Sequence, residues 1–186
     1  ETIDLISMAV VAEDGRELYL VNRDFRWKRI AHSRWYAPRK WNVRHQWLVD
    51  NVVPSLPKLY GDARLHYAGS GPFGLIDWQD PAFRSHAAIA KKVREFLLAD
   101  GEPELWADFG AYDHVALCQL WGPMIALPKG LPMYTNDIQQ EAARLGVAWD
   151  ELPKQEEGNH NALADARHNR VKRSYLSAVA AKAVAT

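Results

Sequence analysis

The sequence predicts a single α/β domain over residues 1–186, on the strength of three observations. An apolar, β-branched run at 3–12 is connected by an Asp-Gly turn to an alternating run at 17–22, which is the pattern of a β-hairpin. The strongest amphipathic helical pattern lies at 80–101, and another short strand is expected at 104–110. A hairpin, crossover helices and a later strand together indicate a sheet covered by helices.

The boundaries of the helices are set by residues that start or stop them. Helical spacing predicts further helices at 43–53, 112–122, 136–146 and from about Asn161 to near the end of the chain. Pro81 is expected in the first turn of the helix at 80–101, and Gly101 follows its end. Either Asn136 or Asp137 is expected to cap the helix that starts there. Loops are expected at 54–80 and 123–134.

The composition fits a folded protein and excludes several classes. Of the 186 residues, 48% are hydrophobic and 25% are charged, which is typical of globular domains rather than disordered chains. The formal net charge is zero, so any affinity for nucleic acid must come from a local patch. No run approaches the ~20 apolar residues that span a bilayer. The one cysteine, Cys118, is interpreted as a core residue; it cannot form an internal disulfide, which favours a reducing cytoplasm.

A local basic patch is present at 23–47, which holds eight Lys or Arg residues against a single acid. Aromatic residues are interleaved with the cations, and this combination can track phosphates and stack unpaired bases. A cationic loop that pairs with acids elsewhere is the alternative. Trp47 lies at helical spacing with nearby valines and is expected in the core. For Trp27 and Trp35, core packing, base stacking and a dimer contact are all open.

Three side chains outside this stretch are candidates for chemistry. Asp113 stands where a strand gives way to a helix, a place where α/β proteins gather ligands, and a carboxylate there can hold Mg²⁺. Asp165 lies among small and apolar residues in the last helix, so it should be partly buried and need a partner or a metal. His160 lies beside Gly158 in a loop and can act as a general base. Each residue also has an ordinary interpretation. Asp113 can be a helix-start acid that favours the helix dipole, Asp165 a solvated or dipole-facing acid, and His160 a surface histidine without a special role.

Two segments combine these residues in a known pattern. GAYDHVAL, at 110–117, resembles the second motif of the DEDD superfamily of 3′–5′ exonucleases, and HNALADA, at 160–166, resembles the third motif of its histidine-bearing branch. With TIDLISMAVVAEDGRELYLVN at the start and WADFGAYDHVALCQLWGPMIALP in the middle, the chain is similar to the polyadenylate-specific 3′-exoribonuclease AS family, which is related to RNase T and oligoribonuclease. The resemblance is weak over 23–80.

The resemblance implies an RNase H-like exonuclease fold, with a mixed central sheet flanked by helices. It implies hydrolysis of the terminal phosphodiesters of single-stranded RNA to nucleoside 5′-monophosphates, with poly(A) as one candidate substrate. Two Mg²⁺ or Mn²⁺ ions about 3.5–4 Å apart would stabilise the attacking and leaving oxygens. Asp113 and Asp165 would be metal ligands, and His160 would take the proton from the attacking water. Relatives are homodimers, so a homodimer is expected.

One motif of the family is not found in the sequence. The first motif, an Asp-x-Glu on a central strand, should lie just before Thr2, and Glu1 and Asp4 have the wrong order and spacing to replace it. We therefore expect an N-terminally incomplete form of a longer exonuclease domain, because a sheet without its middle strand leaves backbone groups unpaired at ~1–3 kcal/mol each. Many relatives carry His-Asn at Asp108-Phe109, and Asp108 is expected to be a strand-end residue rather than an extra acid of the site.

Two other functions stay open at this point. One is a single-stranded DNA exonuclease. The other is a catalytically silent nucleic-acid-binding module, in which the basic aromatic stretch at 23–47 has the main role. The sequence assigns no nucleic-acid-binding residues, base preference or preferred metal.

Overall fold

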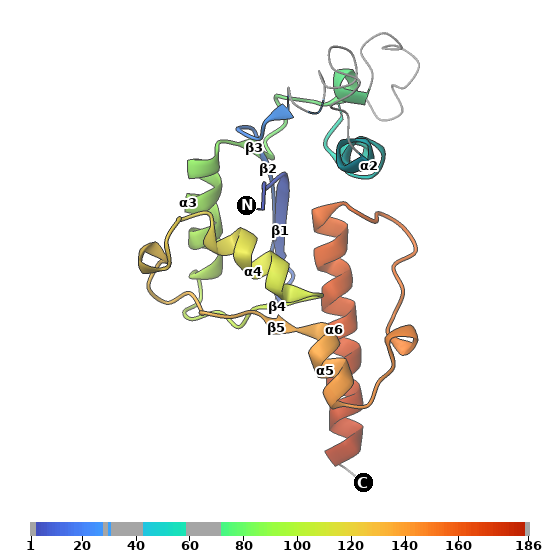
Figure 1. Ribbon diagram of the computed structural model, residues 1–186. Helices are drawn as coiled ribbons and strands as arrows, with labels where there is room; N and C mark the ends of the chain where they lie inside the picture. Colours follow the sequence, from blue (N-terminus) through green and yellow to red (C-terminus); the bar gives the residue numbers. More distant parts are fainter. Residues whose placement is uncertain (1–2, 28–29, 31–42, 59–71, 185–186) are drawn as a thin grey trace.

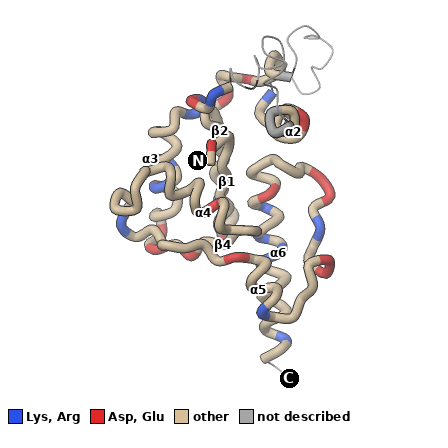
Figure 2. Tube along the Cα trace, viewed as in Figure 1, with Lys and Arg blue, Asp and Glu red and all other residues tan. Residues whose placement is uncertain are grey.

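The computed structural model describes residues 3–27, 30, 43–58 and 72–184. It is a mixed α/β structure, as the sequence predicts. The hairpin of β1 (Ser7–Val11) and β2 (Glu17–Asn22) lies between α3 (His86–Leu97) and α6 (Ala162–Val184), as Figure 1 shows. Acidic and basic residues are dispersed along the described chain (Figure 2), in line with a net charge of zero.

The strands form two small sheets. In the first, β1 and β2 are antiparallel, with Ala9 opposite Tyr19, and β3 (Phe83–Arg84) pairs in parallel with β2. In the second, β4 (Trp106–Ala107) pairs in parallel with β5 (Asn136–Asp137). The predicted hairpin is confirmed, and Gly15 supplies its turn with a φ of 91° that favours glycine. The first strand is shorter than the predicted 3–12.

Besides α3 and α6, three named α-helices and several short 3₁₀ helices lie within the described ranges. The α-helices are α2 (Val43–Asn51), α4 (Gly110–Cys118) and α5 (Ile138–Arg144). The 3₁₀ helices are η2 (Val53–Ser55), η4 (Pro72–Leu75), η5 (Met124–Ala126) and η6 (Trp149–Glu151). Asp137 caps α5 as predicted, because its Oδ1 accepts the backbone N–H groups of Gln139 at 2.8 Å and Gln140 at 3.2 Å.

The prediction of a helix over 80–101 is wrong at its start. Asp80 Oδ1 accepts the N–H of Ala82 in a turn, and fully buried Phe83 belongs to β3. The helix begins only after Ser85, whose side chain accepts the N–H of Ala88. Pairing with β2 and burial of the phenyl ring therefore outweigh the helical tendency of the first residues.

The second sheet also differs from the prediction. The strand expected over 104–110 is only two residues long, and α4 starts at Gly110 rather than at residue 112. Phe109 adopts a left-handed conformation with a φ of 55°, and this ends the strand and turns the chain into α4.

Buried side chains from the hairpin and the helices form the core. One cluster joins β2 to α3 and α4 through Leu20, Ile89, Val93 and Leu117, and another joins α5 to α6 through Ile138, Ala142 and Leu176. Trp27, left open by the sequence, belongs to the core: it is 9% exposed and its Nε1 donates to the Asn22 carbonyl at 3.0 Å. Cys118 is partly buried, with its Sγ 3.4 Å from His114 Nε2, and burial raises the pKa of its thiol. Trp35 lies outside the described residues.

Helix α6 connects the two sheets. It packs against β1 of the first sheet and β4 of the second, while the described residues contain no hydrogen-bonded pairing between the sheets themselves. One edge of β1 and one edge of β4 therefore carry no strand partner in this part of the chain. None of the described helices has both the length and the hydropathy needed to cross a membrane.

Candidate active site

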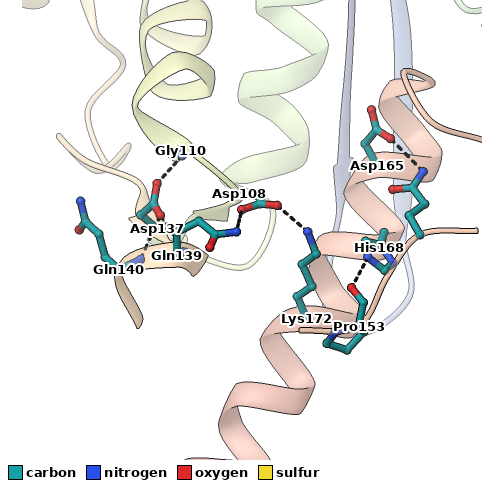
Figure 3. Close-up of polar contacts among 10 residues, drawn as sticks. Asp108, Gly110, Asp137, Gln139, Gln140, Pro153, Asp165, His168 and Lys172 are labelled. Atoms are coloured by element: carbon teal, nitrogen blue, oxygen red, sulfur yellow. Dashed lines mark hydrogen bonds and ion pairs between the residues drawn. The ribbon is translucent and has the colours of Figure 1, made fainter. Parts of the chain in front are cut away.

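The start of α4 is held close to β5, and this contact fixes the position of the helical turn that carries Asp113. The backbone N–H of Gly110 donates to Asp137 Oδ2 at 2.6 Å, as Figure 3 shows. A methyl group on Gly110 would lie 3.2 Å from the Thr135 side chain, so the close approach favours a residue without one. Asp113 then falls in the first turn of α4, where its negative charge faces the positive end of the helix dipole.

Asp113 lies in an acidic environment. Solvent reaches the residue, but the protein around its carboxyl group raises the pKa to about 6, mainly by desolvation, and three other aspartates add to the shift. These are Asp108, Asp137 and Asp165. The fold thus brings the two predicted metal ligands, Asp113 and Asp165, near enough for their charges to interact, although they are far apart in the sequence.

Asp165 lies in the first turn of α6 and is partly buried, as predicted. Its Oδ1 accepts a hydrogen bond from Gln155 Nε2 at 2.9 Å, so the expected partner is a neutral amide rather than a cation. One turn further along α6, His168 Nε2 donates to the Pro153 carbonyl at 2.9 Å (Figure 3). These two bonds hold the segment before α6 against the helix. Asp165 has no ion-pair partner in the described chain.

Asp108 is a strand-end residue, as expected, and it is paired. Its carboxylate lies 2.5 Å from Lys172 Nζ and also accepts Gln139 Nε2 at 2.6 Å (Figure 3). The sequence predicts that Asp108 is not an acid of the site. This prediction is incomplete, because the charge of Asp108 contributes to the raised pKa of Asp113. The sequence reasoning missed Lys172. The signal that could have found it is its spacing of two helical turns from Asp165 on α6.

His160 lies in the loop before α6, with a left-handed φ of 67°. The next residue, Asn161, caps α6: its Oδ1 accepts the N–H groups of Leu163 and Ala164, both at 3.1 Å. His160 is exposed, and its contacts are with the segment of α2 and η2 rather than with the aspartates in the described residues. The ring of Trp47 meets the imidazole ring edge-on, with 4.9 Å between centroids.

The prediction that Trp47 is a core residue is wrong, because its side chain is 46% exposed. The buried residues of this segment are Val49, Val53 and Leu56. Trp47 precedes Val49 by two helical positions, about 200° around the helix, so it points away from the face that packs.

The donor chemistry of the site suits a hard divalent cation. Asp113 and Asp165 offer carboxylate oxygens, which Mg²⁺ and Mn²⁺ prefer. Desolvation is the main cause of the raised pKa of Asp113, and a bound cation would offset the smaller contribution that comes from the neighbouring aspartates. Two carboxylates are too few for a complete site. Within the described ranges, no group of three His, Cys, Asp or Glu side chains lies close enough together to hold a metal ion.

Comparison with known proteins identifies the family. No family model matches the chain. Two proteins of Mycobacterium tuberculosis, from strains CDC 1551 / Oshkosh and ATCC 25618 / H37Rv, are both described as 3′–5′ exoribonucleases. Each is 39% identical to this chain over 168 residues, which cover 89% of the chain and 79% of the relative. The chain belongs to this 3′–5′ exoribonuclease family. The prediction of an exoribonuclease family is thereby confirmed, whereas the DEDD assignment, the poly(A) preference and the site residues stay predictions.

Proposed function

We propose that the chain is the catalytic domain of a metal-dependent 3′–5′ exoribonuclease, with an RNase H-like fold of the histidine-bearing DEDD branch. It releases nucleoside 5′-monophosphates from the 3′ end of single-stranded RNA, with poly(A) as one candidate substrate. The observation that carries the proposal is the relationship to 3′–5′ exoribonucleases, in a chain that places Asp113 and Asp165 in the first turns of α4 and α6, where their charges interact. A phosphodiester is an anion that repels a nucleophile, so this reaction needs positive charge, and the aspartates are the groups that would hold it.

The side chains have distinct roles in this proposal. Asp113 and Asp165 bind Mg²⁺ or Mn²⁺ through their carboxylate oxygens. The bound ions supply charge neutralisation for the phosphodiester and activation of water. His160 accepts the proton of the attacking water on a ring nitrogen; its position in a loop, outside α6, leaves the imidazole accessible to solvent and substrate. Asp137 and Gln155 orient the elements that carry the aspartates.

Two further carboxylates are required, and the family resemblance assigns them to an Asp-x-Glu on a strand ahead of Thr2. The edges of β1 and β4 without a strand partner in the described residues support this assignment. Both strands contact α6, and a strand inserted between them would join the two sheets into one mixed sheet flanked by helices.

The test is degradation of a 5′-labelled single-stranded RNA by a protein in which the Asp-x-Glu segment precedes this chain. We expect a ladder that shortens one nucleotide at a time, with 5′-monophosphate products, in Mg²⁺ or Mn²⁺ and none after chelation. Matched poly(A), mixed-sequence RNA and DNA substrates establish the preference. Shortening of DNA alone would overturn the RNA assignment, and binding without shortening in either metal would favour a silent nucleic-acid-binding module.

We also propose a homodimer, as the family resemblance implies. Sedimentation velocity tests it, and a protein that sediments as a monomer at micromolar concentration would contradict it.

A further inference from the structure

The segment that carries α2 and η2 is attached to the loop before α6 at His160. Ser55 Oγ lies 3.0 Å from the His160 carbonyl, across a sequence separation of 105 residues, and shares its one hydroxyl proton between that carbonyl and the Val52 carbonyl at 2.8 Å. In return, Asn161 Nδ2 donates to the Ser55 carbonyl at 2.8 Å. The Trp47 ring meets the imidazole ring at an interplanar angle of 74°, the edge-to-face arrangement that aromatic pairs favour. One short segment therefore holds both the backbone and the ring of His160.

The backbone at His160 needs this support. A φ of 67° is uncommon for a residue with a side chain, and such conformations persist where the surroundings determine them. The chain just before it is also constrained, because Gly158 has a φ of 74° and lies against Ala164 of α6. With Asn161 fixed as the cap of α6, the ring of His160 is the part of this loop left to be oriented, and the Trp47 ring lies edge-on against it.

Packing of the segment does not account for Trp47. The hydrophobic cluster that anchors η2 contains Val53 and Leu56, together with Phe83 and Ile76, and Trp47 is not among its members. A tryptophan that is 46% exposed contributes little to such a core. Its contact with His160 is its most specific interaction in the described chain.

We propose that Trp47 and Ser55 are positioning residues for His160: Ser55 fixes the backbone carbonyl, and Trp47 fixes the plane of the imidazole ring. The inference rests on the proposed function, in which His160 is the general base. A base must lie within hydrogen-bond reach of the proton that it takes, and small displacements in an active site are costly. The role of these residues is thus to keep the imidazole in a productive orientation, and they do not contact the substrate.

The test combines kinetics with a direct observation of the imidazole, in a protein that carries the Asp-x-Glu segment. The variants are Trp47→Ala, the conservative Trp47→Phe and Ser55→Ala. Trp149→Ala is the matched control, because Trp149 is also exposed, at 70%, and lies on η6. The NMR resonances of the His160 ring, assigned by their loss in His160→Ala, report the contact, since an aromatic ring shifts the signals of nuclei held against it.

We expect Trp47→Ala to lower kcat by about ten- to a hundredfold with little change in KM, and to move the His160 resonances toward those of an exposed histidine. Trp47→Phe should keep most of the parent's kcat and leave the His160 resonances close to those of the parent. Ser55→Ala should lower kcat several-fold. Trp149→Ala should change neither kcat nor the His160 resonances. Unfolding curves show whether each variant is folded. If Trp47→Ala does not fold, the kcat and His160 resonances of Trp47→Phe and Ser55→Ala test the proposal instead.

Two results would overturn the proposal. One is an unchanged kcat and unchanged His160 resonances in Trp47→Ala. The other is a raised KM with unchanged kcat, which would make Trp47 an RNA contact. Failure of the underlying function has a different signature: His160→Ala itself would then keep near-native turnover, whereas a general base contributes typically ~10²–10⁴-fold.

Discussion

The Asp108 carboxylate lies 2.5 Å from the Lys172 ammonium nitrogen and joins the end of β4 to α6. Both side chains are mostly buried, with exposed fractions of 19% and 14%. Asp108 lies two residues before α4, which carries Asp113, and Lys172 lies on the same helix as Asp165. The ion pair therefore ties the chain that leads into α4 to α6, and these two helices carry the proposed metal ligands.

The first prediction is that this ion pair stabilises the fold. Lys172→Met should lower the free energy of unfolding by about 1–3 kcal/mol, because Asp108 keeps its charge in a partly buried place and, among the described residues, retains Gln139 as its one side-chain partner. Urea unfolding measures the loss, and a double-mutant cycle with Asp108→Asn isolates the pairwise part. Lys91→Met is the control: its exposed pair with Glu95 should be worth less than about 0.5 kcal/mol. Equal losses in Lys172→Met and Lys91→Met would contradict the assignment.

A second prediction concerns the loop before α6. Gly158→Ala should destabilise the protein more than Gly146→Ala, although both glycines have a similar positive φ, 74° and 70°. The left-handed backbone costs each alanine about 1–2 kcal/mol. At Gly158 the new methyl group would also lie 2.8 Å from the Ala164 side chain, whereas Gly146 faces open space, so Gly158→Ala should lose about a further 1–3 kcal/mol. Thermal or urea unfolding of the two variants decides, and equal losses would contradict the close contact.

A third prediction concerns pH. The Tyr19 hydroxyl is buried without a hydrogen-bond partner in the described part of the chain, and burial raises its pKa to about 12, with a smaller contribution from Asp80. Tyrosine in the unfolded chain ionises near ~10. The folded state then holds the Tyr19 proton more tightly. The contribution of Tyr19 to stability is therefore fully present below about pH 10 and is lost as the pH rises toward 12.

Tyr19→Phe should reduce this alkaline loss and leave the unfolding free energy at pH 7 unchanged or up to ~1 kcal/mol higher, because an unsatisfied hydroxyl is removed. Urea unfolding at neutral and alkaline pH gives both quantities. Tyr134→Phe, at a tyrosine that is 66% exposed, serves as the control. A marked destabilisation of Tyr19→Phe at pH 7 would mean that the hydroxyl has a partner.

The basic stretch at 23–47 gives a fourth prediction, at residues that lie outside the described part of the chain. If Arg39 and Lys40 contact phosphates, replacing both with Ala should weaken RNA binding and reduce the slope of log K against log salt by ~0.7 for each lost contact. The control is a double alanine variant of Lys91 and Lys92, two exposed cations on α3. A slope that is the same in both variants would return the stretch to a surface or interface role.

The sequence predicted those parts of the fold that local signals determine. The hairpin follows from its Asp-Gly turn, the start of α5 from Asp137 and the start of α6 from the apolar run after Asn161, because each depends on residues close together in the chain. Convergence of Asp113 and Asp165 could be anticipated only through the order of the two motifs in related exonucleases.

The remaining features depend on contacts between distant residues. The pairing of Phe83 with β2 overrides a helical pattern, and no local signal announces a two-residue parallel strand. The ion pair of Asp108 with Lys172 and the contact of Trp47 with His160 join residues that are far apart in the sequence. Helical spacing placed Trp47 beside apolar neighbours but could not tell which face of α2 packs.

The most direct test of the proposed metal site is the release of nucleoside 5′-monophosphates by Asp165→Asn, measured across a Mg²⁺ titration with the Asp-x-Glu segment present. Asn retains an acceptor for Gln155 but lacks the charge that holds a cation, so the fold should persist while activity is lost. Asp150→Asn, at an exposed aspartate of η6, is the matched control and should keep full activity. We predict that Asp165→Asn unfolds at the parent's temperature and releases no monophosphate above the chelated background at any Mg²⁺ concentration. Native-like activity in a folded Asp165→Asn protein would contradict the proposed site.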